Sequence, residues 1–355
     1  MQKRDYNNIK LQNYLNNRVF VTKSVTTEKA SELEVVRKIV ESDDNLRSLF
    51  TKEYIIKSLD SNFEYDSYQI ETKEKSFVLK INQEDSDRIL EKEYGILSSL
   101  KNKGISPEAI HYADVDAFCI LVTSFEYSAS FSHFSKEDLL FNIRTLANCV
   151  SYLHETDVTN LQVFDLFDMT KYISDFESNL GDDYNSILKN KNFKTYLNIR
   201  DSYLADIFDL KSEQQNLCLA HTNYDKSRLL YRGGLIKLTN FQFASKIDPM
   251  LDLALLFLYL DIPEEAQSVF LDQYVKSFKT PLNEKDCLSR VNFYKNNLAP
   301  KIILLKTAAL RFYEEVLYGD ERPKKYIKYI KNYESIRQFI DEKDRSTLDN
   351  IFYVY

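Results

Sequence analysis

Several residue types are scarce in this 355-residue sequence, and each scarcity excludes a class of protein. Tryptophan is absent, and only six glycines are present, so few turns can depend on glycine. We therefore expect long helices joined by polar Asn, Asp and Ser connections. The four cysteines lie far apart without a CxxC pair, and the four histidines do not cluster. This spacing argues against a Cys or His metal site and favours buried thiols in a reduced, cytoplasmic protein.

Long hydrophobic runs and an excess of positive charge are also lacking. The longest apolar run, Leu253–Leu260, is too short to span a bilayer, and the first residues contain no apolar signal segment. The net charge of −7 argues against a dedicated nucleic-acid binder. The basic and aromatic segment Lys324–Tyr333 is better explained by a helix that packs its Tyr and Ile side chains inward. We expect neither a membrane nor a nucleic-acid partner.

The first third of the chain divides into a helical part and a β-rich part. Residues 1–55 show helical spacing of apolar residues and are expected to form an N-terminal helical extension. In residues 56–128, "YDSYQIETKEKSFVLKIN" alternates in two runs, as a β-hairpin does. An amphipathic helix ending at Gly104 and two further strands follow. This pattern predicts a small antiparallel sheet with one helix.

The rest of the chain is predicted to be mainly helical. Residues 129–340 show helical periodicity, interrupted by the strand-like runs "LCLAH", "RLLY" and "LIKLTNF". Residues 341–355 are assigned to a C-terminal tail. A small β lobe followed by a larger helical lobe is a bilobal α+β arrangement, in which ligands commonly bind in the cleft between the lobes.

Five segments in a fixed order carry a resemblance to a known family. They are "SFVLKI" with Lys80, "ILEKEYGILSSLKNKGISP" with Glu93, "FCILVTSFEY" with Ser124 and Phe125, "LANCVSYLHETDV" with His154, and "LAHTNYDKSRLLY" with the downstream "LIKLTNFQFASKIDPMLDLALLF". Over about residues 57–260, this order resembles the aminoglycoside phosphotransferase and choline kinase family, relatives of the protein kinases. The resemblance implies a bilobal, protein-kinase-like fold.

The resemblance also implies roles for single residues. Lys80 would grip nucleotide phosphates and Glu93 would be its ion-pair partner, although a lysine that ends a strand is often only a solvated charge. Backbone groups of Ser124 and Phe125 would meet an adenine edge. His154 is best interpreted as a core histidine whose ring is satisfied.

Three positions depart from the family pattern, which runs His-Gly-Asp-Leu-His and then Asn, with Asp-Phe downstream. Here His221 begins the loop, Asn223 takes the place of the catalytic aspartate, and Arg228 takes that of the metal-binding asparagine. Asn240 replaces the second metal carboxylate, whereas the downstream carboxylates Asp248 and Asp252 remain as residues that brace the fold. The three positions thus change from a summed charge of −2 (two Asp, one Asn) to +1 (two Asn, one Arg).

These departures predict a protein that has lost ordinary kinase chemistry. A neutral amide at Asn223 cannot take up a hydroxyl proton, and a guanidinium repels Mg²⁺. We expect no metal site, no required cofactor, and a binding or scaffold role toward a protein or a small anionic or hydroxylated ligand. Arg228 is either an anion clamp or a salt-bridged surface residue.

Two active alternatives stay open. An ATP- and Mg²⁺-dependent small-molecule kinase could use a remodelled site with Asp225 or Asp248 as base or metal ligand. A different transfer chemistry could use Arg228 to hold an anionic donor, because a fold does not fix a function.

Overall fold

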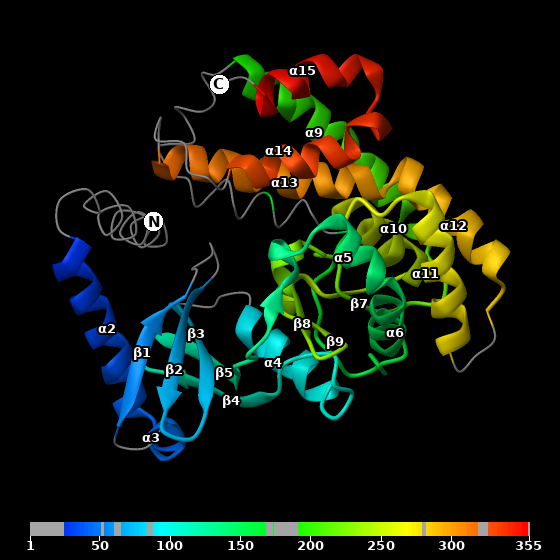
Figure 1. The fold of residues 1–355 in the computed structure, drawn as a ribbon. Coiled ribbons are helices and arrows are strands. Elements are labelled where there is room, and N and C mark those ends of the chain that lie inside the picture. The colour runs from blue at the N-terminus through cyan, green and yellow to red at the C-terminus, as the bar shows by residue number, and fades with distance from the viewer. Residues whose placement is uncertain are drawn as a thin grey trace.

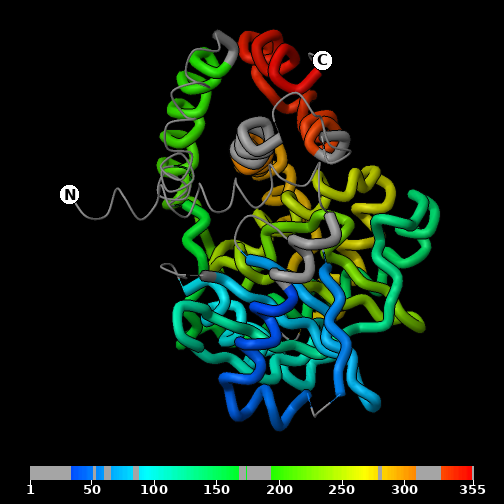
Figure 2. Tube along the Cα trace, turned by 90° about the vertical axis from the view of Figure 1, so that its left-hand side faces the viewer, coloured from blue at the N-terminus to red at the C-terminus, as the bar shows by residue number. Residues whose placement is uncertain are grey.

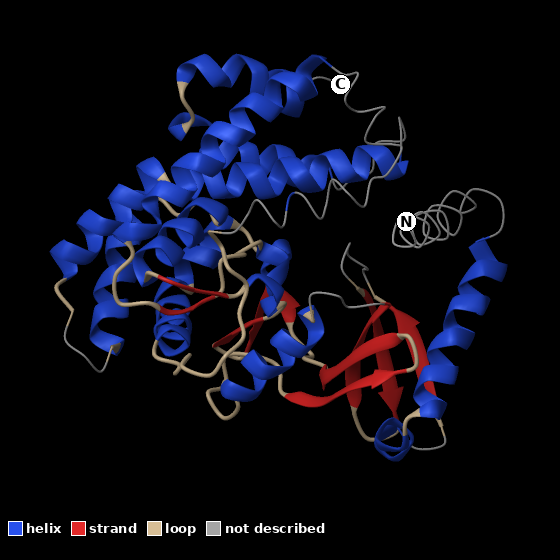
Figure 3. Cartoon of the chain, turned by 180° about the vertical axis from the view of Figure 1, so that it is seen from behind, coloured by secondary structure: helices blue, strands red, loops and turns tan. Residues whose placement is uncertain are grey.

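The fold consists of two lobes, one built on a β-sheet and one dominated by helices (Figure 1). A computed structural model describes residues 25–50, 53–59, 65–83, 88–167, 173, 191–278, 282–318 and 326–353. Seen from behind, the strands of the large sheet gather in one lobe, and most of the helices lie in the other (Figure 3). The predicted bilobal α+β fold is thus confirmed.

The smaller lobe holds a five-stranded antiparallel sheet in the order β1-β2-β3-β5-β4. The predicted hairpin forms β2 and β3, and the two further predicted strands form β4 and β5. The predicted helix is α4, which ends five residues before Gly104. The bounds are β1 Tyr54–Ser58, β2 Asp66–Thr72, β3 Ser76–Gln83, α4 Ile89–Ser99, β4 Ala109–Val115 and β5 Phe118–Ser124.

Two N-terminal helices, α2 (Val25–Ser42) and α3 (Asp44–Phe50), cover one face of this sheet. Val36, Ile39 and Phe50 pack there against sheet residues that face the two helices, such as Ile120. The next residue, Leu121, points to the opposite face and joins the core around α4, as strand alternation requires. The expected helical extension over residues 1–55 is therefore part of the lobe where it is described, and its last residues begin β1. Residues 1–24 lie outside the described residues.

The larger lobe is built from helices around a core that includes the wholly buried face of α10. Short strands interrupt them where the sequence predicted, with β8 and β9 joined by Gly233 and Gly234, both at positive φ. The bounds are β6 Ala129–Ser130, α5 Lys136–Phe141, α6 Ile143–His154, α9 Lys191–Asp209, β7 Cys218–Ala220, β8 Leu229–Arg232, β9 Leu235–Leu238, β10 Ser245–Ile247, α10 Pro249–Tyr259, α11 Glu264–Ser277, α12 Glu284–Asn297, α13 Ala299–Tyr318 and α14 Tyr326–Ile336.

The C-terminal segment 341–355 is predicted to be a tail, and the structure contradicts this prediction. It contains helix α15 (Glu342–Phe352), which lies beside α9 at the end of the molecule far from the sheet (Figure 2). The Phe352 ring stacks on Tyr333 of α14 at a centroid distance of 4.5 Å. Apolar residues at helical spacing on α15, including Leu348, are buried in this contact, which explains why the segment is ordered as a helix.

Helix α14 confirms the interpretation of the basic and aromatic segment, since Tyr329 and Tyr333 are buried in the core. Of the helices in the described ranges, none combines the length and apolar character needed to cross a bilayer.

Candidate functional site

A buried ion pair joins the sheet of the smaller lobe to helix α4 and also contacts the larger lobe. Lys80 lies on β3 and donates to both carboxylate oxygens of Glu93 on α4, at 2.8 and 2.7 Å. Burial by itself would lower the pKa of Lys80, but the Glu93 carboxylate outweighs it and holds that pKa above its usual value. Glu93 also accepts the backbone N–H of Phe241 from the larger lobe at 3.0 Å. The structure thus brings together the predicted pair and links it to the segment that begins at Asn240.

Asn240 lies at the junction of the two lobes, two residues after the end of β9. Its backbone is left-handed (φ +64°), a conformation that asparagine tolerates better than most residues. Its neighbours assign the amide orientation, with the nitrogen facing Gln242 Oε1 at 3.0 Å and the Tyr65 hydroxyl at 2.5 Å. The amide oxygen Oδ1 then faces Arg228, 3.0 Å from Nη2, 3.1 Å from Nη1 and 3.2 Å from Nε. Two of the three substituted positions are therefore in direct contact.

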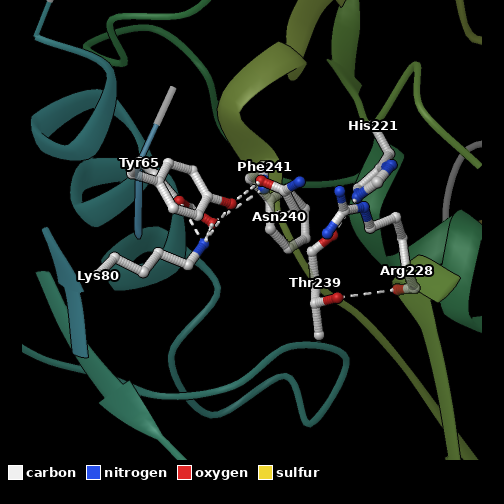
Figure 4. Close-up of polar contacts among 8 residues, drawn as sticks. Tyr65, Lys80, His221, Arg228, Thr239, Asn240 and Phe241 are labelled. Atoms are coloured by element: carbon white, nitrogen blue, oxygen red, sulfur yellow. Dashed lines mark hydrogen bonds and ion pairs between the residues drawn. The ribbon is translucent and has the colours of Figure 1, made fainter. Parts of the chain in front are cut away.

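Tyr65 is a site residue that the sequence did not reveal. It immediately precedes β2, is only 5% exposed, and places its hydroxyl between Lys80 and Asn240 (Figure 4). Lys80 Nζ lies 3.1 Å from the hydroxyl oxygen and 4.5 Å from the centroid of the ring. Burial raises the pKa of the Tyr65 hydroxyl, so it is a neutral phenol. The sequence showed only that this stretch lacks glycine, which gives no sign of an inward-pointing ring.

His221 is buried at the start of the loop that follows β7. Its Nε2 lies 2.9 Å from the Thr239 carbonyl, which fixes the proton on that nitrogen. Its Nδ1 is buried, with no hydrogen-bond partner in the described part of the chain. Burial lowers the pKa of His221 to about 4, so the imidazole is neutral at physiological pH.

Asp252 on α10 fixes the backbone of the loop that begins at His221. It accepts hydrogen bonds from the backbone N–H groups of His221 (3.3 Å) and Thr222 (2.9 Å), from the Tyr224 hydroxyl, and from His154 Nε2 at 2.9 Å. His154 Nδ1 contacts the hydroxyl of Tyr274 at 2.7 Å. His154 is thus the satisfied core histidine that the sequence predicted, and Asp252 braces the fold.

Thr222 takes the position where the resembled family has glycine, and it does so with strain. Its φ of +58° is unfavourable for a β-branched residue. Its hydroxyl donates to the Phe243 carbonyl at 2.7 Å and lies 3.4 Å from Nζ of Lys306 on α13. Burial lowers the pKa of Lys306 to about 7. The sequence offered no signal for Lys306, because it lies 84 residues from Thr222 along the chain.

The two carboxylates considered as substitute bases have structural partners. Asp225 caps the short helix Lys226–Arg228, and its Oδ1 accepts the Ser227 N–H at 2.9 Å and the Ser227 hydroxyl at 2.6 Å. Asp248 is fully buried and caps α10, bonding Met250 N–H, the Tyr294 hydroxyl and Arg290. Asn223 is half-buried and lies two residues before Asp225, next to the strained Thr222.

The Arg228 guanidinium points toward Asn240 and lies near His221 (Figure 4). Its backbone is fixed by hydrogen bonds with Asp225 and Thr239 at 2.8 and 2.9 Å. Across the described ranges, no carboxylate lies within ion-pairing distance of this guanidinium. The salt-bridged surface arginine considered from the sequence is therefore not what the structure shows.

The strand end and hinge provide fewer free donors than the resemblance implied. The Ser124 N–H donates to the Glu108 carbonyl at 2.9 Å, and the Phe125 N–H donates to the Ser76 carbonyl at 3.1 Å. Glu126 is held by Lys237 at 2.8 Å. An adenine edge would therefore have to use groups other than these two N–H donors.

The residues at the junction do not fit a divalent cation. Asn223, Arg228 and Asn240 supply no carboxylate, and Mg²⁺ in such sites needs anionic oxygen ligands. Within the described residues, no group of three or more His, Cys, Asp or Glu side chains could hold a metal ion. Glu93, which accepts the Phe241 N–H at this junction, is already bonded to Lys80.

Known structures share this fold at low sequence identity. Ethanolamine kinase from Plasmodium vivax is 12% identical with a TM-score of 0.61, covering 93% of this chain and 95% of that protein. Choline kinase LicA from Streptococcus pneumoniae, also solved in complex with AMP, is 17% identical with a TM-score of 0.56 over 85% and 99% of the two chains. An aminoglycoside-3'-phosphotransferase of type VIII is 17% identical with a TM-score of 0.51 over 74% and 98%.

Sequence comparisons add no closer relative: a scan against protein-family models and a search of curated proteins both find no match. The chain has the fold of choline kinases and aminoglycoside phosphotransferases, as the order of its segments predicted.

Proposed function

We propose that this protein is a catalytically inactive or impaired kinase-fold protein that works by binding a ligand or partner. One observation carries the proposal: the Arg228 guanidinium lies against Asn240 at the junction where the resembled kinases hold their metal. A fixed positive charge now stands where a cation would have to bind, so the site favours anions.

The loop chemistry supports this proposal. Asn223 stands at the position of the catalytic aspartate, and an amide has no lone pair basic enough to accept a hydroxyl proton at neutral pH. His221 does not replace it, because its ring is fully buried and its Nε2 is engaged with Thr239. Asp225 is committed to capping the next short helix.

The same site supports a ligand with negative charge. The five N–H groups of a guanidinium match phosphate or carboxylate oxygens, and Arg228 has no carboxylate partner in the described ranges. The ligand is thus proposed to be a small anionic molecule or an acidic group of a protein partner, bound without metal.

The test compares nucleotide binding and turnover with and without Mg²⁺. We expect thermal shifts of the wild-type protein by ATP to be the same in Mg²⁺ and in EDTA, and no transfer of phosphate to hydroxylated substrates such as choline or aminoglycosides. The triple variant Asn223→Asp, Arg228→Asn, Asn240→Asp should acquire a Mg²⁺-dependent shift. A matched control, Arg232→Asn on the same hairpin, removes an exposed arginine and should change neither result. Mg²⁺-dependent turnover by the wild-type protein would overturn the proposal.

One observation favours the active alternative, an ATP-dependent small-molecule phosphotransferase with a remodelled site. The buried Lys80–Glu93 pair is intact, and in a kinase fold such a pair positions nucleotide phosphates. This version requires Asp225 to act as the base, since Asp248 is sealed by Arg290 and Tyr294. It predicts that Asp225→Ala abolishes phosphate transfer while Asp225→Asn keeps the fold; activity that survives both changes contradicts it.

A further inference from the structure

The Tyr65 hydroxyl lies in a cluster of hydrogen-bond donors. Its oxygen is 3.1 Å from Lys80 Nζ and 2.5 Å from the amide of Asn240 (Figure 4). On the other side of that amide is the Arg228 guanidinium, whose charge also acts on the Tyr65 hydroxyl. A single neutral oxygen thus sits where an ammonium and an amide converge, beside a guanidinium.

The charges of this cluster do not balance. Lys80 and Arg228 contribute two positive charges and Glu93 one negative charge, so the formal sum is +1. Tyr65 adds no charge, because it is a buried phenol whose pKa is raised by burial. An uncompensated charge in a poorly solvated site is unfavourable, and an oxyanion at the hydroxyl position would compensate it.

We propose that the Tyr65 hydroxyl occupies an oxyanion site for a phosphate group, formed by Lys80, Asn240 and Arg228 and used without a divalent metal. The inference rests on the proposed function. It deepens that function by naming phosphate as the ligand class and Tyr65 as the side chain that blocks the site. The phosphate displaces the Tyr65 side chain on entry. Lys80 supplies a point charge and Arg228 a planar fork, and a tetrahedral group with several oxygens can meet both.

The position of Tyr65 permits this displacement. It lies one residue before the first paired residue of β2, Asp66, which is aligned with Ile81. Moving the Tyr65 side chain therefore leaves the sheet pairing intact. The Lys80–Glu93 bonds also stay in place, because Tyr65 is a third partner of the ammonium rather than part of the pair.

Calorimetric titration in EDTA tests the site with inorganic pyrophosphate, inorganic phosphate and ATP. A ligand that must displace an occupant binds with an affinity reduced by the fraction of open sites. We expect Tyr65→Ala to tighten pyrophosphate binding at least about tenfold, and Tyr65→Phe to tighten it less because the ring must still move. Arg228→Gln in the Tyr65→Ala background should abolish the gain, whereas the exposed control Arg232→Gln should keep it.

A second measurement reports the displacement directly. The chain contains no tryptophan, so Tyr65→Trp introduces a single indole at the occluded position. Adding pyrophosphate in EDTA should shift its emission to longer wavelength as the ring moves into water. No shift at saturating pyrophosphate, or equal affinities of the wild-type and Tyr65→Ala proteins, would overturn the proposal.

The outcomes of these measurements distinguish a failure of this inference from a failure of the proposed function. If wild-type protein turns over ATP only with Mg²⁺, the proposed function fails. If pyrophosphate binds in EDTA but its affinity is the same in the Tyr65 variants, only the proposal that Tyr65 blocks the site is wrong. If ATP binds in EDTA but pyrophosphate and phosphate do not, the phosphate site is wrong and an adenine contact carries the binding.

Discussion

The amide oxygen of Asn240 lies 3.0 Å from Nη2 of Arg228. In the family pattern that the sequence resembles, these two positions hold a carboxylate and an asparagine. In this chain they hold an amide and a guanidinium, and the two groups contact each other. Four predictions concern the stability of this junction and of the buried residues around it.

The first prediction concerns the Asn240 amide. Asn240→Asp places a carboxylate beside Arg228, and a charge-assisted bond is stronger than a neutral one. We expect a gain of about 1 kcal/mol in the free energy of unfolding, measured in urea. The gain should vanish in a double variant that also carries Arg228→Gln, as a double-mutant cycle would show. A gain that is unchanged without the guanidinium contradicts the pairing.

The second prediction concerns the buried ion pair. Lys80→Met leaves Glu93 buried, with the Phe241 N–H as its one remaining partner among the described residues, so the free energy of unfolding should fall by about 3 kcal/mol or more. The exposed pair between Lys57 and Glu71 on neighbouring strands provides a control. Lys57→Met should cost less than about 1 kcal/mol. If Lys80→Met and Lys57→Met lower the free energy of unfolding by the same amount, burial does not make the Lys80–Glu93 pair more important for stability.

The third prediction concerns the pH dependence that His221 brings. Its pKa is about 4 when folded and about 6.5 in an unfolded chain, so between these values the unfolded state binds the extra proton. Stability is therefore lost as the pH falls from about 6.5 to 4, by up to about 3 kcal/mol. His221→Gln keeps an N–H donor for Thr239 without titrating. This variant should flatten that part of the pH profile of urea unfolding.

The fourth prediction concerns Lys306, whose pKa of about 7 lies below the usual 10.5 because of burial. Between these values the unfolded state binds more protons, so stability rises with pH from about 7 to 10. At pH 6 the folded protein must bury the charge. Lys306→Met should therefore stabilise the protein by a few kcal/mol at pH 6, and by less at pH 9.

The result for Lys306→Met can be checked by comparing melting temperatures at the two pH values. Lys306→Gln serves as a control that keeps a hydrogen-bond donor for Thr222 but no charge. If both variants destabilise the protein equally at pH 6 and pH 9, burial of the charged Lys306 side chain does not destabilise the folded protein.

Local sequence patterns predicted the hairpin of β2 and β3, helix α4, and the interrupted helical lobe, because side-chain periodicity reports the face that an element buries. They failed at the C-terminal segment. The segment 341–355 was assigned to a tail, yet α15 forms because α9 and α14 offer it an apolar surface. The segment has apolar residues at helical spacing, but the surface that buries them is assembled from residues distant in the chain.

The candidate site divides in the same way. The sequence by itself determined which groups are present: the amide of Asn223, the guanidinium of Arg228, the amide of Asn240, and a Lys80 and Glu93 suited to pairing. Residue identity alone decides basicity and charge, so the prediction of a missing base and missing metal ligands needed no structure.

Only the tertiary structure decided which groups meet. Tyr65 and Asn240 are 175 residues apart in the chain, and their contact depends on how the two lobes pack. The same packing leaves Arg228 without a carboxylate among the described residues and places Lys306 under Thr222. Charge and hydrogen-bonding capacity belong to single residues, whereas burial and partnership belong to the folded chain. Burial is what lowers the pKa values of His221 and Lys306.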